Sequence, residues 1–418
     1  MTVTQDTRVD RWRREALRLD AADPLAPFRD EFLLGAAPVT AYLDGNSLGR
    51  PLRATATALD AFVHEQWGGR LIRGWTDAWM RWPEDLGDLV GRVALGAAAG
   101  RTVVADSTTV LLYKLVRAAV DAAAGTGRDE IVTDTDNFPT DRYVLEGIAA
   151  ERGLTLRWIE TDPAAGVTLE QVRAAVGPRT ALATFSHVAY RSGHLADAPG
   201  ITRAVHEAGG LVLWDLCHSA GSVEIALDDW GVDLAVGCTY KYLNGGPGAP
   251  AFAYLNARHH GRLLQPVHGW MGHADPFAMG RGYVPDPGVR QLVSGTPPVV
   301  GMVPVRTGVE QLERAGVAAV RAKSVQLTSF ALELADDLLV PAGVEVASPR
   351  DPARRGGHVT LRRDDFRAVN DRLWDEDVLP DFRAPDGIRL GLAPLSTSFG
   401  EVLDGVLALH RIVTGEPS

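Results

Sequence analysis

The sequence predicts an α/β protein built on a mostly parallel, doubly wound sheet, followed by a smaller α+β part. Between residues 102 and 255, short apolar runs alternate with segments of helical periodicity. Apolar runs of this length, bounded by polar or turn residues, are typical of strands buried in a parallel sheet. Two of them, 211–214 and 234–238, end directly in polar residues. Those polar residues should lie at the carboxyl edge of the sheet, where α/β proteins bind ligands.

The elements follow from the pattern in chain order. A charged amphipathic helix before residue 20 could pack on a partner or on the body of the protein, and a short strand enters a Gly-Asn-Ser turn at 42–49. The alternating βα units come next, and a helical stretch from 299 to 339 opens the smaller α+β part. The expected strands are 102–105, 130–133, 154–159, 180–185, 211–214, 234–238, 251–255, 357–361 and 388–392. The other expected helices are 110–124, 141–152, 168–176, 198–208, 366–376 and one from 399.

Length and composition exclude several classes of protein. The chain of 418 residues can hold one large domain and one smaller domain. Its net charge of -11 argues against nucleic acid or an anionic membrane as the main partner. The polar N-terminus does not resemble a signal peptide, and no apolar run approaches the ~20 residues of a membrane span. We therefore expect a cytoplasmic protein, in which Cys217 and Cys238 are packing residues rather than a disulfide or metal pair.

Lysine is scarce, which narrows any lysine chemistry. The sequence contains lysine only at positions 114, 241 and 323. Lys323 lies in a polar helical pattern typical of a solvated face, and Lys114 could be a structural or a phosphate-side cation. Only Lys241 follows an apolar strand and precedes a Gly-rich turn. With Asp215 after the neighbouring strand, Lys241 fits a pyridoxal phosphate (PLP) site: the lysine holds the aldehyde, and the carboxylate keeps the pyridine nitrogen protonated. The alternative is an ordinary lysine at a strand end.

Several other positions suit such a site. Thr108 and Thr109 open a helix, whose free N–H groups and positive dipole end can bind phosphate, although simple N-capping would use the same residues. Phe138 could lie over a flat ring, and Asp141 could support it. Arg389 stands inside an apolar strand, where its guanidinium could grip a carboxylate or form an internal salt bridge. A segment with four tryptophans (67, 75, 79 and 82) is expected to be buried core or a subunit interface, and one of them could wall an aryl pocket.

An ordered set of motifs resembles the kynureninase family. The motifs are Asp215-x-x-His218, 239–248 (TYKYLNGGPG), 269–273 (GWMGH) and 295–298 (GTPP), together with 42–49 (YLDGNSLG), 138–141 (FPTD) and Arg389. The match covers nearly the whole chain. It implies a PLP-dependent hydrolase of fold type I, with a seven-stranded sheet. The expected reaction cleaves the β–γ bond of L-kynurenine, or of a 3-hydroxy or substituted kynurenine, to anthranilate and L-alanine, as in tryptophan breakdown.

The resemblance also implies roles for single residues. Lys241, Tyr240 and Asp215 would be catalytic, and Asn46 and Arg389 would bind the substrate. The residues expected to hold the cofactor are Thr108, Thr109, Phe138, Thr140, Asp141, Ser186, Asp215, His218, Tyr240, Lys241, Trp270 and Thr296. Trp270 and Thr296 would come from the other subunit of a homodimer with shared active sites. No metal is expected.

The resemblance further implies three parts of the chain: an N-terminal segment, 1–60, that joins the small domain, a large PLP-binding domain at 61–300, and a small α+β domain at 301–418. Two other functions compete with the kynureninase reading. One is a different PLP reaction on this fold, such as desulfuration or β-elimination. Desulfurases of this fold generally need a reactive cysteine on a mobile loop, whereas Cys217 and Cys238 flank strands. The other is a non-catalytic PLP-fold binding module, against which Lys241, Asp215 and Arg389 argue. Side-by-side turnover assays separate the three.

Overall fold

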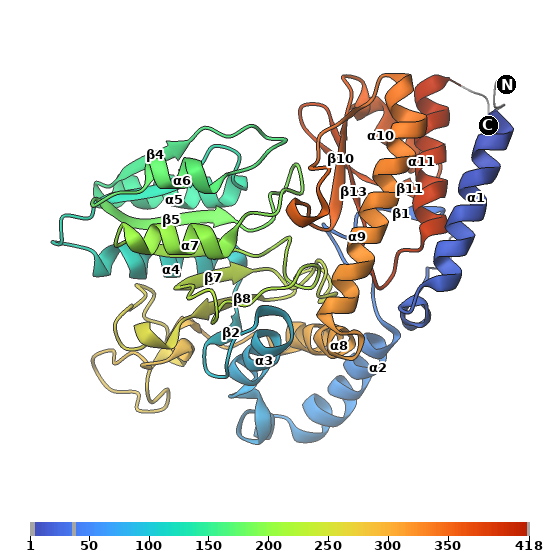
Figure 1. Cartoon of the computed structure of the whole chain (residues 1–418). Helices are drawn as coiled ribbons and strands as arrows, with labels where there is room; N and C mark the ends of the chain where they lie inside the picture. Colours follow the sequence, from blue (N-terminus) through green and yellow to red (C-terminus); the bar gives the residue numbers. More distant parts are fainter. Residues whose placement is uncertain (1–4, 36–38, 416–418) are drawn as a thin grey trace.

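A seven-stranded sheet forms the larger part of the molecule (Figure 1). The structure is a computed structural model that describes residues 5–35 and 39–415. The strands lie in the order β2-β8-β7-β6-β5-β3-β4. Strand β8 runs opposite to all the others, which share one direction. The bounds are β2 (Thr102–Ala105), β3 (Glu130–Asp134), β4 (Thr155–Ile159), β5 (Thr180–Ser186), β6 (Leu211–Asp215), β7 (Leu234–Gly237) and β8 (Ala251–Leu255). The predicted mostly parallel sheet is therefore confirmed, with strand ends within one residue of those expected.

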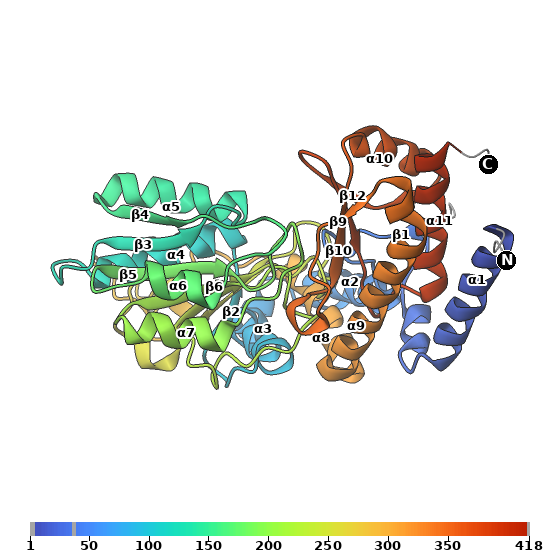
Figure 2. The same ribbon diagram turned by 45° about the horizontal axis from the view of Figure 1, so that its top comes forward.

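Helices cover both faces of this sheet because its strands are apolar on both sides. Val104 packs in one buried cluster with residues of α3, α6, α7 and α8, whereas its neighbour Val103 packs in another with residues of α4 and α5. Successive side chains of a strand point to opposite faces, which explains this division. Figure 2 shows α5 and α7 on opposite sides of the strands. The bounds are α3 (Trp82–Val90), α4 (Thr108–Ala122), α5 (Pro139–Arg152), α6 (Leu169–Ala175), α7 (Ala198–Glu207) and α8 (Val299–Ala315).

A smaller α+β part lies beside the large sheet (Figures 1 and 2). Its four strands are antiparallel in the order β12-β13-β10-β9, and a separate parallel pair joins β1 to β11. A second buried cluster, which includes Phe330 and Phe399, holds this part together. Its strands are β1 (Ala41–Tyr42), β9 (Glu345–Val346), β10 (His358–Arg362), β11 (Val378–Leu379), β12 (Asp381–Arg383) and β13 (Gly387–Gly391). Its helices are α1 (Gln5–Ala22), α9 (Val317–Leu334), α10 (Phe366–Asp375) and α11 (Phe399–Thr414).

The N-terminal segment packs on the C-terminal part of the same chain, which is one of the two alternatives left open for its helix. Helix α1 contacts α11, and Trp12 donates its ring N–H to Asp337 Oδ2 at 2.7 Å. Asp20 accepts the backbone N–H of Phe399 at 3.0 Å, at the start of α11. The division at residues 60 and 300 stays a prediction. Among the described residues, no helix is both long and apolar enough to cross a membrane.

Three expectations about the elements need correction. The helical stretch 299–339 is broken at Gly316, which adopts φ 77° between α8 and α9. Two helices were not predicted, namely α2 (Arg53–Ala61), which precedes the tryptophan segment, and α3, which begins at Trp82. The prediction that Lys323 is solvated is wrong: the residue is 3% exposed, and its Nζ lies 2.7 Å from Asp23 Oδ2. The pairing carboxylate comes from a segment 300 residues away, so the local pattern held no sign of it.

Short helical turns complete the chain. The π-helical turns are Phe62–Gly68, Trp75–Trp79, Gly91–Leu95 and Ala335–Leu339. The 3-10 turns are Ala26–Glu31, Ala257–His259, Trp270–Gly272, Val289–Leu292, Val340–Ala342 and Pro352–Arg354.

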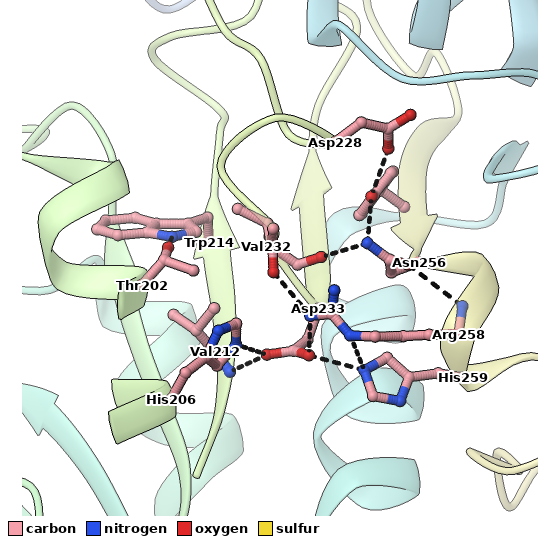
Figure 3. Close-up of polar contacts among 12 residues, drawn as sticks. Thr202, His206, Val212, Trp214, Asp228, Val232, Asp233, Asn256, Arg258 and His259 are labelled. Atoms are coloured by element: carbon pink, nitrogen blue, oxygen red, sulfur yellow. Dashed lines mark hydrogen bonds and ion pairs between the residues drawn. The ribbon is translucent and has the colours of Figure 1, made fainter. Parts of the chain in front are cut away.

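A buried carboxylate, that of Asp233, holds the amino end of β7. This is the edge of the sheet opposite the carboxyl edge, where Asp215 ends β6. Asp233 directly precedes β7 and accepts the backbone N–H of Val212, in β6, at 2.9 Å (Figure 3). His206 and His259 each place a ring nitrogen 2.7 Å from its oxygens, and Arg258 pairs with it. Burial alone would raise the pKa of Asp233, but these hydrogen bonds lower it below its usual value. This network fixes how β6 and β7 align.

Candidate active site

Lys241 follows β7 in a tight turn at the carboxyl edge of the sheet. It is 8% exposed, and its Nζ lies 3.1 Å from His218 Nε2. The same nitrogen lies 5.9 Å from the ring centres of Phe138 and Tyr240. Thr239 stabilises the turn by donating its hydroxyl to Pro250 O at 2.6 Å. The amine is therefore held between aromatic and imidazole rings and has no carboxylate partner among the described ion pairs.

Asp215 ends β6, the strand beside β7, so it leaves the sheet at the same edge as Lys241. It is 4% exposed and pairs in register with Val236. Its Oδ1 accepts the backbone N–H of Cys217 at 2.8 Å, and its Oδ2 accepts the hydroxyl of Ser186 at 3.4 Å. These bonds fix the carboxylate without a cation, which leaves it free to pair with a positive group on a ligand.

A second carboxyl lies close to both residues. Asp141, in the first turn of α5, is 1% exposed, and its Oδ2 has no hydrogen-bond partner among the described residues. Burial raises the pKa of Asp141 well above its usual value, repulsion by Asp215 and Asp134 adds to this, and attraction by Lys241 opposes it. An unsatisfied buried oxygen of this kind needs a partner, and a ligand N–H or O–H could supply it.

Asn137 links two of the expected residues, and the sequence reasoning assigned it no role. Its Oδ1 accepts the hydroxyl of Ser186 at 2.7 Å and the backbone N–H of Phe138 at 2.8 Å. It therefore orients the Phe138 ring, which meets the ring of Tyr190 edge-on at 5.3 Å. Thr140 lies half-buried in the first turn of α5. The only sequence signal for Asn137 was its place in the turn after β3.

The start of α4 lies against the turn that follows Asp215. Thr108 and Thr109 are the first residues of this helix, and Ser107 caps it by accepting the N–H of Val110 at 3.5 Å. Thr108 Oγ1 lies 3.9 Å from Cys217 Sγ. Capping by Ser107 uses only one of the helix's free N–H groups, so the first turn can still bind an anion.

Lys114 is a structural cation, which was one of its two expected roles. It is fully buried on α4, and its Nζ donates to Asp106 Oδ2 at 2.6 Å, to Ser294 Oγ at 2.6 Å and to Leu292 O at 2.5 Å. All three of its protons are therefore used. The ion pair ties the loop before α4 to the segment that carries Thr296.

Arg389 is engaged in an internal ion pair, which was the alternative to carboxylate binding. It is 1% exposed on β13, and its Nε donates to Asp381 Oδ2 at 2.7 Å. Its Nη1 donates to Tyr190 O at 2.6 Å, and its Nη2 donates to Ser47 Oγ at 3.0 Å. Burial lowers the pKa of Arg389, and the charge of Asp381 opposes that shift. No local pattern marks Asp381 as its partner.

Asn46 lies beside the same strand. It is fully buried, and neither its Nδ2 nor its Oδ1 has a hydrogen-bond partner among the described residues. Its side chain lies over Gly391, where an added Cβ would come within 1.8 Å of Asn46 Oδ1. Only glycine permits this approach, and the amide is left with unused donors and acceptors beside Arg389.

Two expected residues do not reach this cluster within the chain. Trp270 is 42% exposed and contacts the ring of Phe277 at 6.0 Å, and Thr296 is also exposed. No described contact joins either residue to Lys241 or Asp215. The residues that the chain itself gathers at the edge of the large sheet are Thr108, Thr109, Phe138, Asp141, Ser186, Asp215, His218, Tyr240 and Lys241.

The cluster fits pyridoxal phosphate by its chemistry. Within residues 5–35 and 39–415, Lys241 supplies an amine without a carboxylate partner and Asp215 a carboxylate without a cation. Phe138 supplies an aromatic ring near the amine. The start of α4 supplies N–H groups for a phosphate, and Asp141 leaves one buried oxygen unpaired. Together they match the aldehyde, the pyridine nitrogen, the flat ring and the phosphate of this cofactor.

Comparisons with known proteins agree with this assignment. Residues 320–409 match the family model described as the kynureninase C-terminal domain. The chain is 40% identical to kynureninase of Pseudomonas fluorescens over 407 residues, covering 96% of this chain and 95% of the relative. It is also 40% identical to kynureninase of Burkholderia pseudomallei (strain 1106a) over 409 residues, covering 97% and 96%.

Solved structures share the fold at low sequence identity. Apo cysteine desulfurase from Thermococcus onnurineus NA1 superposes with a TM-score of 0.79 at 18% identity, over 96% of this chain and 98% of that one. A mutant of C-DES with glycine covalently linked to its PLP cofactor superposes with a TM-score of 0.81 at 18% identity, over 91% and 98%. At this identity the likeness concerns the fold alone, which confirms the predicted fold type I.

Proposed function

The chain belongs to the kynureninase family, and from this premise we propose that it hydrolyses the β–γ carbon bond of L-kynurenine, or of a ring-substituted kynurenine, to anthranilate and L-alanine. The observation that carries the proposal is that Asp215 ends β6 and Lys241 lies in the turn after the adjacent parallel strand β7, so that both lie at one edge of the sheet. The sequence interpretation depended on this arrangement. Had the two side chains lain on opposite faces of the sheet, the proposal would have no basis.

The cofactor would be pyridoxal phosphate, held by residues already brought together. Lys241 would bind its aldehyde, Asp215 its pyridine nitrogen, and the start of α4 its phosphate. When bound, this cofactor supplies an electron sink for charge that develops on the substrate's α-carbon. The further residues proposed to contact it are Phe138, Thr140, Asp141, Ser186, His218 and Tyr240.

Proton transfer is proposed for two side chains. Lys241 Nζ would remove the proton from the α-carbon, and its contact with His218 orients the amine. His218 stays neutral beside it, because burial and then the charge of Lys241 hold its pKa well below the usual value. Tyr240 would donate a proton to the β-carbon once anthranilate has left. Burial raises the pKa of Tyr240 far above its usual value, so the hydroxyl keeps the proton that this step needs.

Substrate orientation is proposed for Arg389 and Asn46. Both line the side of β13 that faces Ser47, and Asn46 still has unused hydrogen-bonding atoms. A substrate α-carboxylate would have to share the guanidinium with Asp381 or replace it. A bidentate guanidinium–carboxylate contact would fix the α-carbon in front of Lys241.

A homodimer with shared sites would explain the exposed residues. Trp270 and Thr296 are proposed to reach the cofactor of the partner subunit. An apolar pocket of about 290 Å³ lies next to Thr296 and supports the proposal that a second subunit contacts the protein there. Its lining residues are Phe62, Trp67, Trp75, Trp79, Pro297, Pro298, Val299, Val300 and Gly301. A cytoplasmic location remains part of the proposal.

The test is release of fluorescent anthranilate from L-kynurenine by the purified protein loaded with pyridoxal phosphate. We expect turnover with kynurenine or 3-hydroxykynurenine and none with cysteine under the same conditions. Sulfide release from cysteine without anthranilate would instead indicate a desulfurase. No turnover with any of the three would contradict the proposed reaction.

A further inference from the structure

The two cysteines, expected to be packing residues, approach each other just past the carboxyl ends of β6 and β7. Strands β6 and β7 pair Asp215 with Val236, and Cys217 and Cys238 each lie two residues further along. Leu216 extends the pairing by donating its N–H to Val236 O at 2.8 Å. Cys238 Sγ lies 3.7 Å from Cys217 O, and both thiols are free.

This alignment suits a disulfide. Neighbouring strands lie about 4.8 Å apart, and disulfides join Cα atoms that are roughly 4.4–6.8 Å apart. The pKa of each thiol is also shifted by a hydrogen bond to the other, which accords with the approach of Cys238 Sγ to Cys217 O.

The surroundings also favour a reactive thiolate. Burial would raise the pKa of Cys238, but the hydrogen bond from Cys217 and the positive charge of Lys241 bring it down to about 7. The same hydrogen bond, and then burial, raises the pKa of Cys217. Cys238 is 3% exposed, whereas Cys217 is half-buried beside Thr108 and gives access to the pair.

We propose that Cys217 and Cys238 form a modification site, which a hydroperoxide converts to a disulfide that weakens cofactor binding. The Cys238 sulfur attacks the peroxide, so that an S–O bond forms, the O–O bond breaks, and hydroxide leaves. The Cys217 sulfur then attacks Cys238, the S–S bond forms, and the S–O bond breaks. A second hydroxide leaves in this step, and the two hydroxides take the two thiol protons, the one that Cys238 lost to become a thiolate and the one from Cys217. Two thiols thus lose two electrons to one hydrogen peroxide molecule, which becomes two water molecules.

The bond would act on the cofactor site through short connections. The N–H of Cys217 holds Asp215 Oδ1 at 2.8 Å, and Cys217 Sγ lies 3.9 Å from Thr108 Oγ1. On the other strand, Cys238 precedes Lys241 by three residues. A covalent bond between the two turns shifts the amine, the carboxylate and the start of α4 relative to one another. This consequence rests on the proposed function, whereas formation of the disulfide does not.

The test treats the full chain with hydrogen peroxide, both loaded with and stripped of pyridoxal phosphate. A peptide map without reductant should show Cys217 linked to Cys238, faster in the stripped protein because Lys241 is then a free cation. The linked protein should bind pyridoxal phosphate about tenfold more weakly or worse, since small displacements of such groups cost this much. Dithiothreitol should restore binding, measured by the visible absorption of the lysine-bound cofactor.

Matched variants complete the experiment. Cys217→Ser and Cys238→Ser should each form no link and keep cofactor binding after the same treatment. The wild-type peptide map stands on its own should a variant fold poorly. Thiols that stay free, or that oxidise separately without a link, would overturn the proposed site. A linked protein that binds the cofactor as well as the reduced one would overturn its effect. Neither outcome bears on whether the reduced protein releases anthranilate.

Discussion

Lys241 Nζ and His218 Nε2 lie 3.1 Å apart at the carboxyl edge of the large sheet. Because burial and the lysine charge keep His218 neutral, its ring nitrogen can accept a hydrogen bond from the amine and carries no competing charge. The lysine is thus oriented without being neutralised by a carboxylate. An amine that must bind an aldehyde and then carry a proton needs this arrangement.

The first prediction concerns this amine. Lys241→Ala should abolish turnover and the visible absorption of bound cofactor, and Lys241→Arg should do the same because a guanidinium forms no stable imine. Lys323→Arg is the matched control, since it preserves the charge that pairs with Asp23 and should leave activity unchanged. The measurements are anthranilate release and an absorption spectrum. Steady-state turnover by Lys241→Ala would refute the assignment.

The second prediction concerns the carboxylate beneath the cofactor. Asp215→Asn preserves the shape but removes the charge that would keep the pyridine nitrogen protonated. We expect kcat to fall by about 10²-fold or more. Ser186→Ala should have a smaller effect, because its hydroxyl lies 3.4 Å from Asp215 and acts through it. Equal losses in both variants would show that the charge is not the main contribution of Asp215.

The third prediction separates substrate binding from chemistry. Arg389→Lys should raise KM for kynurenine about tenfold to a hundredfold, because a lysine cannot make two parallel hydrogen bonds to a carboxylate. Binding of pyridoxal phosphate should be unchanged. Arg383→Lys is the control, since it pairs with the same Asp381 from a more exposed position. A lower kcat with unchanged KM in Arg389→Lys would contradict carboxylate binding.

The fourth prediction tests whether the sites are shared between subunits. Lys241→Ala is expected to be inactive, and Thr296→Arg should block cofactor binding in whichever site Thr296 serves. If that site belongs to the partner, a mixed dimer holds one site with both native residues. Mixing the two inactive proteins under conditions that exchange subunits should therefore restore activity. Failure to recover activity, with mixed dimers verified by mass spectrometry, would place Thr296 in its own subunit's site.

The fifth prediction concerns stability and pH. Asp233→Asn should lower the free energy of unfolding by about 3 kcal/mol at neutral pH, because it breaks a buried charge network. The pKa of Asp233 is lowered in the folded protein, so its contribution is present above the unfolded pKa and is lost as the pH falls through the folded value. Urea unfolding should show the difference between wild type and variant shrinking only in strong acid. A constant difference at all pH values would contradict this.

The sequence predicted the large sheet well because most of its strands are bounded apolar runs that need no distant partner to be recognised. It also predicted the positions of Asp215 and Lys241, since strand ends of parallel neighbours meet at one edge. It failed where a partner lies far along the chain. Lys323 is buried because Asp23, 300 residues away, neutralises it. For Arg389 both roles were left open, and its partner Asp381 lies eight residues earlier, on the neighbouring strand β12. Neither partner is marked by any local periodicity.

The unsatisfied side-chain amide of Asn46 and the bridging hydrogen bonds of Asn137 could not be predicted from the sequence for a related reason. Both residues lie in turns, where asparagine usually serves its own backbone. Only the packing of Gly391 against Asn46, and of Ser186 against Asn137, distinguishes them from ordinary turn residues.

The pairing of β1 with β11 has a consequence for synthesis on the ribosome. Residues 41–42 bond only to residues 378–379 in that two-stranded sheet, so the first strand emerges long before its partner exists. At usual rates of translation the delay is roughly half a minute. The early segment must stay unpaired throughout that time, and chaperones that shield nascent apolar stretches would find it there.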